Sequence, residues 1–271
     1  MIKPDVIGII PAAGHARRLG HLPCSKEIFP IGFQHDARSG QPRPKAVTHY
    51  LLEHFRDAGI REAIIIVRPD KSDIPRFLGD GHAFGVNLRY QTIIASPCSP
   101  ISVDAAFEYV WGRTVALGFP DILFNSRGIY EPALSRLQTT GADIVLGLFP
   151  AQYPAMVDMV EMNPDGEMIR IQIKPSKTSL VYQWAIAVWN PRFSAFMHEF
   201  LDEGLLTPQR YSELLNRAQR QTELHMSDVV IAAQQHGLKV QTEVVSDLPC
   251  LDIGTPQTLS EAIRQYAVDR P

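Results

Sequence analysis

Short and almost continuously apolar segments alternate with longer amphipathic stretches through the first half of this chain. Residues 64–67 read Ile-Ile-Ile-Val, and residues 6–10 are equally free of polar side chains. Strands that are buried on both faces have this composition, and they occur in parallel sheets covered by helices. The sequence therefore predicts an α/β fold with a doubly wound, mostly parallel sheet that includes some antiparallel strands and is flanked by helices.

The rhythm of the sequence changes near residue 150. An Asn-Pro-Asp-Gly turn at 163–166 separates two short β-rich segments, which predicts a β-hairpin. No low-complexity linker divides the chain, so we expect a single domain over 1–271, with the halves 1–150 and 151–271 sharing one cleft. The expected strands are 6–10, 63–67, 88–94, 115–117, 144–149, 156–162, 168–173, 181–189 and 238–245, and the expected helices are 48–58, 103–111, 191–201, 208–218, 228–236 and 256–266.

The composition is that of an ordinary globular protein. Among 271 residues, 26 basic and 29 acidic side chains give a net charge of −3, and 45% of the residues are apolar. These figures argue against intrinsic disorder, a coiled coil and the basic field of a nucleic-acid-binding protein. Cys24, Cys98 and Cys250 form no C-x-x-C pair, and no stretch approaches the roughly 20 apolar residues of a membrane span. We expect a cytoplasmic protein with no nucleic-acid or membrane partner.

The segment directly after the first strand combines small residues with cations. It reads Pro-Ala-Ala-Gly-His-Ala-Arg-Arg-Leu-Gly at 11–20, and Ser-Lys-Glu-Ile-Phe-Pro-Ile follows at 25–31. Small residues let backbone N–H groups approach phosphate oxygens, and the cations supply positive charge. The segment lacks both the G-K-[S/T] ending of a P-loop and the G-x-G-x-x-G pattern of dinucleotide-binding folds. The residues alone leave a phosphate site and a tight turn with solvated arginines equally open.

Both stretches resemble the opening motifs L-A-G-G-x-G-T-R-L and S-K-x-L-x-P-(I/V) of sugar-1-phosphate nucleotidylyltransferases, especially the glucose-1-phosphate thymidylyltransferases. Further motifs follow in the order of that family along nearly the whole chain. They are L-G-F-P-D-I-L-F at 117–124, which is similar to L-G-D-x-x-F with two residues inserted, G-A-D-I-V-L-G at 141–147, N-P-D-G at 163–166 with K-P at 174–175, E-L-H-M-S-D-V at 223–229 and L-D-I-G-T-P at 251–256. The resemblance implies a Rossmann-like nucleotidyltransferase fold with a small β-hairpin extension. It also implies that residues 1–150 bind nucleotide and residues 151–271 bind sugar phosphate.

The resemblance implies a reaction as well. An oxygen of a sugar-1-phosphate attacks the α-phosphorus of a nucleoside triphosphate, which yields a nucleoside-diphosphate sugar and pyrophosphate. The family favours dTTP or UTP with glucose-1-phosphate or a sugar-like phosphate, and its members are commonly homo-oligomers. No general base is required, because a phosphate monoester has a second pKa of about 6 and is mostly a dianion at neutral pH.

The same resemblance assigns roles to individual residues. Arg18 would hold the leaving β- and γ-phosphates, because a planar guanidinium binds two oxygens at once, and Lys26 would lie where the phosphates of the two substrates meet. Gly147 would approach a sugar hydroxyl, or else relieve crowding in its strand. Lys174 would reach the sugar phosphate, or else be a solvated lysine of the hairpin. The loop residues expected to bind nucleotide are Ala12, Ala13 and Gly14.

Asp121 and Asp252 are the expected metal ligands. Both follow a predicted strand, where open α/β sheets place their ligands, and two carboxylates against substrate phosphates are a usual site for Mg²⁺. The alternatives are a Pro-Asp turn for Asp121 and a helix N-cap for Asp252. The expected cofactor is therefore Mg²⁺.

The chain departs from the family motifs where specificity is decided. Ile173 stands in place of the glutamate of E-K-P, and residues 95–104 lack the glutamine and the glycine of the base-recognition segment. Residues 32–45 are rich in Gly, Pro and polar side chains and predict a surface loop. A cyclitol or modified sugar phosphate is therefore an open alternative as substrate. Two other functions also stay open: a catalytically weak regulatory paralogue that binds nucleotide-sugar, and a cytidylyltransferase for a non-sugar phosphate.

Overall fold

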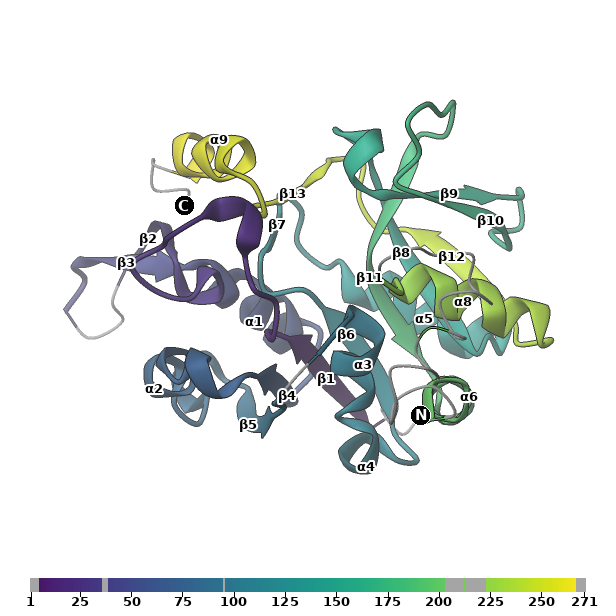
Figure 1. The fold of residues 1–271 in the computed structure, drawn as a ribbon, viewed down its shortest axis with the longest axis horizontal. Helices are drawn as coiled ribbons and strands as arrows, with labels where there is room; N and C mark the ends of the chain where they lie inside the picture. The colour runs from purple at the N-terminus through teal and green to yellow at the C-terminus, as the bar shows by residue number, and fades with distance from the viewer. Residues whose placement is uncertain (1–4, 36–38, 95, 203–211, 213–222, 267–271) are drawn as a thin grey trace.

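A mixed sheet of nine strands forms the centre of the part of the chain that the computed structural model describes, which is residues 5–35, 39–94, 96–202, 212 and 223–266 (Figure 1). The parallel strands lie in the order β6-β1-β4-β5. β11 runs antiparallel to β6, β8 and β9, while β12 is parallel to β8. The strands are β1 (Val6–Pro11), β4 (Glu62–Val67), β5 (Asn87–Thr92), β6 (Thr114–Gly118), β8 (Ile144–Pro150), β9 (Asp158–Met162), β10 (Met168–Ile173), β11 (Tyr182–Trp189) and β12 (Val240–Val244).

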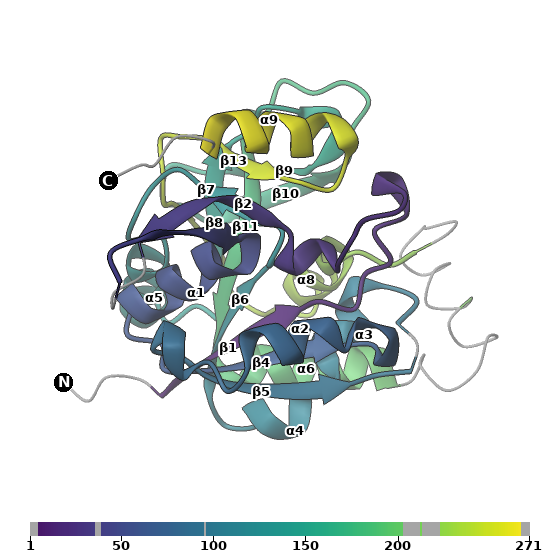
Figure 2. The same ribbon diagram turned by 90° about the vertical axis from the view of Figure 1, so that its left-hand side faces the viewer.

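Helices cover both faces of this sheet, which confirms the predicted α/β class (Figures 1 and 2). Because β11 pairs with β6, strands from both halves of the chain belong to one sheet. The hairpin β9–β10 forms the expected extension around its turn, where Gly166 N donates to Asn163 O at 3.0 Å. The helices are α1 (Val47–Asp57), α2 (Asp73–Leu78), α3 (Ser99–Asp104), α4 (Phe107–Val110), α5 (Tyr130–Thr140), α6 (Pro191–Asp202), α8 (Met226–Gln235) and α9 (Pro256–Tyr266).

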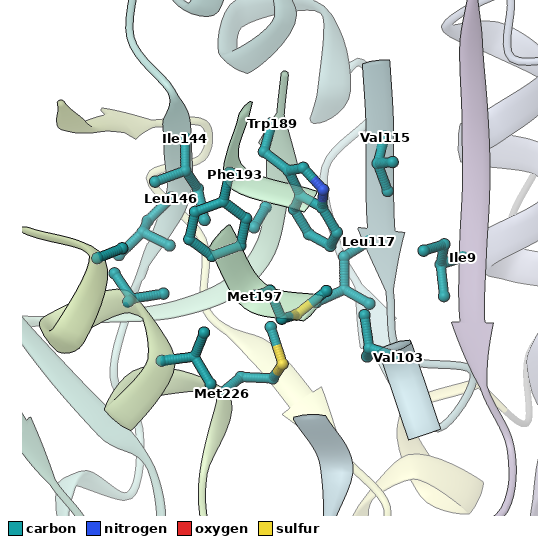
Figure 3. Close-up of a cluster of buried hydrophobic side chains, with 14 of the residues drawn as sticks. Ile9, Val103, Val115, Leu117, Ile144, Leu146, Trp189, Phe193, Met197 and Met226 are labelled. Carbon is teal, nitrogen blue, oxygen red and sulfur yellow. The ribbon is translucent and has the colours of Figure 1, made fainter. Parts of the chain in front are cut away.

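Alternate residues of the strands supply two hydrophobic clusters, one on each face of the sheet. On β1, Ile9 belongs to the first cluster and Ile10 to the second. In the first cluster, Trp189 and Phe193 pack with their ring centroids 5.3 Å apart, between side chains of β6, β8 and α6 (Figure 3). This double-sided burial is the reason that the strands are almost continuously apolar.

The prediction of a surface loop over residues 32–45 was wrong in its main part. β2 (Pro30–His35) and β3 (Pro42–Ala46) form a separate two-stranded antiparallel sheet, in which Phe33 lies opposite Pro44. Proline cannot donate to a ladder but is accepted in an edge strand, so the Pro-rich composition concealed β3. The hairpin packs beside α9, which closes the fold at its carboxyl end (Figure 2).

Two further elements differ from the expectation. The helix expected at 103–111 is two short helices, because α3 begins at Ser99 and α4 begins only at Phe107. A second small sheet pairs β7 (Ile122–Phe124) with β13 (Cys250–Asp252), and no pattern in the sequence predicted it. The helix expected at 208–218 lies outside the described residues, apart from residue 212. Among the helices that the structure describes, none has the length and apolarity that crossing a membrane would require.

Gly147 lies inside β8, directly opposite Ile186 of β11. A Cβ atom at position 147 would come within 2.4 Å of Ile186 Cγ1, which is far closer than two carbon atoms pack. Ile186 is fully buried and cannot move aside without disturbing the core. Close packing of the two strands therefore explains the glycine.

We expect Gly147→Ala to lower the free energy of unfolding by about 1–3 kcal/mol, the usual cost of overpacking a core. Urea unfolding measures the change. Gly14→Ala is the matched control, because nothing lies within 4 Å of a Cβ added there, and its free energy of unfolding should stay near that of wild type. A Gly147→Ala variant as stable as wild type would contradict this account of the glycine.

Candidate active site

The small sheet β7–β13 brings two distant aspartates together. Asp121 immediately precedes β7, and Asp252 is the last residue of β13, where it pairs with Ile122. Ile253 N also donates to Asp121 O at 3.0 Å, which ties the two chain segments at this point. The pairing of two three-residue strands thus places both carboxylates at one position.

Lys26 forms an ion pair with Asp121, its Nζ donating to Asp121 Oδ2. The side chains are only 16% and 14% exposed, so water screens the pair weakly. Burial by itself would lower the pKa of Lys26, but the charges of Asp121 and Glu27 outweigh it and hold that pKa above its usual range. Burial raises the pKa of Asp121, yet Lys26 more than reverses the effect, so this carboxylate is ionised.

The neighbours of Asp252 do not fully offset the effect of burial on its carboxylate. Burial, and next the negative charge of Asp121, raise the pKa of Asp252 to about 6, although Lys26, Arg18 and the N–H of Gly254 act against the rise. Gly254 N donates to Asp252 Oδ1 at 2.6 Å. The ionised form of Asp252 is therefore incompletely stabilised by its surroundings, and a further cation at this point would favour that form.

Arg18 reaches the same point from the first half of the chain. A Cβ atom added to Gly254 would lie 2.7 Å from Arg18 Nη2 and 2.8 Å from Asp252 Oδ1. The guanidinium and the carboxylate thus both lie beside Gly254. The structure brings together four of the five charged residues that the sequence singled out: Arg18, Lys26, Asp121 and Asp252.

Two buried cations that the sequence analysis missed hold the loop at 11–16. Arg68 Nη1 donates to Ala13 O at 3.0 Å, and Lys71 Nζ donates to Ala12 O at 2.9 Å. Lys71 also pairs with Glu27 at 2.6 Å. Both cations follow β4, whose carboxyl end lies beside that of β1. The sequence held one signal for these cations, which is that they follow an apolar strand. Neighbouring parallel strands end at the same edge of a sheet, so residues after one strand can contact the loop after the other.

Two adjoining cavities meet at the site of the four charged residues. One of about 1230 Å³ lies over the loop and the segment at 96–102, and one of about 240 Å³ lies over β11 and the start of α8. Asp121 and Lys174 line both. The predicted residues that line the larger cavity are Ala13, Gly14, Arg18, Lys26, Asp121 and Lys174. Those that line the smaller cavity are Asp121, Lys174 and Asp252. Ala12 and Gly147 line neither cavity.

The smaller cavity owes its shape to an irregularity in β11. The register against β8 shifts between Trp184 and Ile186, so the pleat is interrupted at Ala185. Bulges of this kind redirect side chains and occur beside functional sites. Trp184 and Ala185 both line the cavity, together with Asp158 and His225, which the sequence analysis did not single out.

Asp121 and Asp252 offer two carboxylates to a metal ion. Among the described residues, no group of three or more His, Cys, Asp or Glu side chains could hold one. Two adjacent carboxylates, of which Asp252 is incompletely compensated, nevertheless fit Mg²⁺, because this ion prefers oxygen ligands and usually takes only one or two from protein.

Comparison with known proteins gives a consistent result. No family model matches the chain. It is 31% identical over 175 residues to a glucose-1-phosphate thymidylyltransferase of Mycolicibacterium smegmatis, covering 62% of this chain and 55% of that protein. It is 28% identical over 187 residues to the enzyme of that name from Neisseria meningitidis, covering 66% of this chain and 58% of that protein. The matched part thus spans little more than half the length of these relatives.

A solved structure supports the fold over the full length of the chain. It shows a Bacillus anthracis protein, provisionally assigned as a glucose-1-phosphate thymidylyltransferase, in complex with a sucrose. The TM-score is 0.78, with 98% of this chain and 97% of that chain covered, at 17% sequence identity. At this identity the likeness concerns the fold alone, and it confirms the predicted α/β architecture of a mostly parallel sheet flanked by helices.

The raised pKa of Asp252 predicts a pH dependence of stability. Because its folded value of about 6 exceeds the unfolded value of 3.8, the folded chain binds this proton more tightly, and stability falls as the pH rises from about 4 to 6. Asp252→Asn carries no charge. Without divalent cations, we therefore expect it to be more stable than wild type by about 1–3 kcal/mol near neutral pH, where one pKa unit corresponds to about 1.4 kcal/mol.

Urea unfolding at about pH 7.5 and about pH 4 checks this expectation, and the difference between variant and wild type should vanish at the lower pH. Asp57→Asn, which removes an exposed carboxylate paired with Arg56, is the control and should show no such pH-dependent gain. An Asp252→Asn variant that is no more stable than wild type at the higher pH would contradict the assignment of the raised pKa.

Proposed function

We propose that this chain, which belongs to the sugar-1-phosphate nucleotidylyltransferase family, joins a nucleoside triphosphate to a sugar-1-phosphate and releases pyrophosphate. One observation carries the proposal: Arg18, Lys26, Asp121 and Asp252 converge where two cavities meet. Charge accumulates on phosphate oxygens during nucleotidyl transfer, and fixed charges at that point are the main source of catalysis.

Each cation has a separate task in this proposal. Arg18 lines the larger cavity and binds the leaving pyrophosphate portion, because its planar fork matches two phosphate oxygens. Lys26 lies at the boundary of the cavities and stabilises the phosphate that changes partner. Arg68 and Lys71 keep the loop in place through its carbonyl groups, so that the loop can border a triphosphate without rearranging.

Lys174 and Asp121 connect the two substrates. Lys174 has a positive φ of 44° and lines both cavities, which suits a role in orienting the phosphate of the sugar toward the nucleotide. That phosphate is already a dianion at neutral pH, so the site needs no general base. Correct alignment of two bound reactants is itself a large part of the rate enhancement.

Asp121 and Asp252 would hold Mg²⁺ in this proposal. When bound, the ion would supply positive charge to the phosphate oxygens of the substrates. The two carboxylates position it at the boundary of the cavities, and Asp121 also fixes the ammonium group of Lys26. The incomplete compensation of Asp252 supports this assignment, because a divalent cation would favour its ionised form.

We propose dTTP and glucose-1-phosphate as the first substrate pair, since they correspond to the name of the curated relatives. The larger cavity includes Ser96 and Ser102 on its wall, but these two hydroxyls are bonded to each other, and Ser96 Oγ also donates to Cys98 O at 2.7 Å. Because these hydroxyls are already hydrogen-bonded, we propose that Ser99 and backbone groups of residues 96–102 contact the base of the nucleotide.

Release of pyrophosphate tests the function. We expect Mg²⁺, dTTP and glucose-1-phosphate to give pyrophosphate faster than pairs containing CTP, UTP, ATP or GTP, and a chelator to abolish the release. No pyrophosphate from any pair would point to a protein that binds nucleotide-sugar without turnover. Release that requires CTP and a polyol phosphate would point to a cytidylyltransferase.

Asp252→Asn should lower kcat by at least about 100-fold, because it removes one carboxylate from the proposed metal site and leaves the packing intact. The matched control is Asp57→Asn, an exposed position far from both cavity linings, whose rate should equal that of wild type. Wild-type rates for Asp252→Asn would refute the metal site.

A further inference from the structure

The hairpin β9–β10 carries a carboxylate beside the position where the family motif has one. Ile173, which stands in place of that glutamate, pairs directly with Asp158 across the hairpin. Side chains of directly paired residues project from the same face of an antiparallel ladder, about 5 Å apart at Cβ. Asp158 therefore lies at the neighbouring position on the same face, and it lines the smaller cavity. Because the proposed function places the triphosphate in the larger cavity, the smaller one is left for the ring of the sugar-1-phosphate.

A chain of hydrogen bonds fixes the orientation of this carboxylate. Trp184 Nε1 donates to Ser227 Oγ at 2.8 Å, and Ser227 Oγ donates to Asp158 Oδ2 at 2.6 Å. A serine hydroxyl has one proton, so accepting from Trp184 directs that proton toward Asp158. Because the three residues come from β11, α8 and β9, the position of the carboxylate is set by three separate elements (Figure 1).

The other carboxylate oxygen, Oδ1 of Asp158, is withdrawn from solvent and accepts no hydrogen bond from the described part of the chain. A buried acceptor without a donor is costly, and such atoms in native proteins call for an explanation. Ser227 satisfies Oδ2 only. The fold thus orders a carboxylate at the wall of a cavity and leaves half of its hydrogen-bonding capacity unused.

The remaining walls of the smaller cavity fit a single hydroxylated ring. At about 240 Å³, the cavity is below the roughly 300–1,000 Å³ of sites that enclose drug-sized ligands, so one ring fits better than an oligosaccharide. Trp184, Met156 and Met226 offer apolar surface to the C–H groups of such a ring. Lys174 lies on the boundary with the larger cavity, where the phosphate of the ring compound would lie.

We infer that Asp158 determines specificity for the sugar, with its Oδ1 accepting a hydrogen bond from a ring hydroxyl of the sugar-1-phosphate in the smaller cavity. The inference rests on the proposed function for the identity of the substrate. It assigns the recognition of the ring to β9, one strand away from the apolar Ile173. The class of substrate that follows is a phosphorylated ring with a hydroxyl group facing β9.

The substitution Asp158→Asn tests hydrogen bonding to the sugar without changing the packing of the side chain. The asparagine has the same shape, and its carbonyl oxygen can still accept from Ser227, which places an N–H₂ donor where Oδ1 was. We expect the KM for the sugar phosphate to rise about 10- to 100-fold, while the KM for the nucleotide changes less than about 2-fold. Glu161→Gln is the matched control, because Glu161 lies on the same strand but pairs with Arg170 outside the cavity, and it should leave both KM values unchanged.

Monodeoxy analogues of glucose-1-phosphate provide a readout that a purely structural role would not change. Wild type should use one analogue, the one lacking the hydroxyl that faces Asp158, at least about 10-fold less efficiently than the parent compound. In Asp158→Asn and Asp158→Ala that difference should disappear, whereas Glu161→Gln should retain it. If both Asp158 variants discriminate among the analogues as wild type does, the inference is overturned.

Turnover by wild type in these assays tests the proposed function separately. If wild type releases no pyrophosphate, calorimetric titration with glucose-1-phosphate makes the same comparison without chemistry. Binding to wild type that is at least about 10-fold tighter than binding to Asp158→Asn supports the role of Asp158 even then. Equal affinities, or no binding to wild type, overturn it.

Discussion

Two buried carboxylates held at one point, with one lysine between them, are the constraint on which the site depends. The pairing of β7 with β13 forces Asp121 and Asp252 together, and Lys26 neutralises only the first of them. Burial, and next the negative charge of Asp121, raise the pKa of Asp252 to about 6, although Lys26 and Arg18 act against the rise. In our proposal, a divalent cation and the polyphosphate of the nucleotide complete this site, because a cation would favour the ionised form of Asp252.

The surrounding fold stabilises this arrangement from the first half of the chain. Parallel strands β1 and β4 end at the same edge of the sheet, so Arg68 and Lys71 can reach the carbonyl groups of the loop after β1. The loop has alanine at positions 13 and 16, where the motif L-A-G-G-x-G-T-R-L that it resembles has glycine. Ala13 is buried, and Ala16 adopts the left-handed conformation with φ of 52°.

In our proposal, the second half contributes recognition of the ring in addition to the charges of Lys174 and Asp252. Trp184, beside the register shift in β11, lines the smaller cavity, and the bonds from Trp184 through Ser227 orient Asp158. The chain that lacks a glutamate at position 173 thus has another carboxylate across the hairpin. In our proposal, the smaller cavity recognises the ring and the larger one stabilises phosphate charge, and Asp121 and Lys174 line both.

The sequence by itself determined the strands that are apolar throughout, the hairpin turn at 163–166, and four charged residues of the site, because burial on two faces and local motifs are written in short segments. Only the tertiary structure decided that β2–β3 is a hairpin, that Gly147 serves packing, and that Arg68, Lys71 and Asp158 border the site. These features depend on which strands become neighbours and in what register. Register arises from contacts between residues far apart in the chain, which no local pattern records.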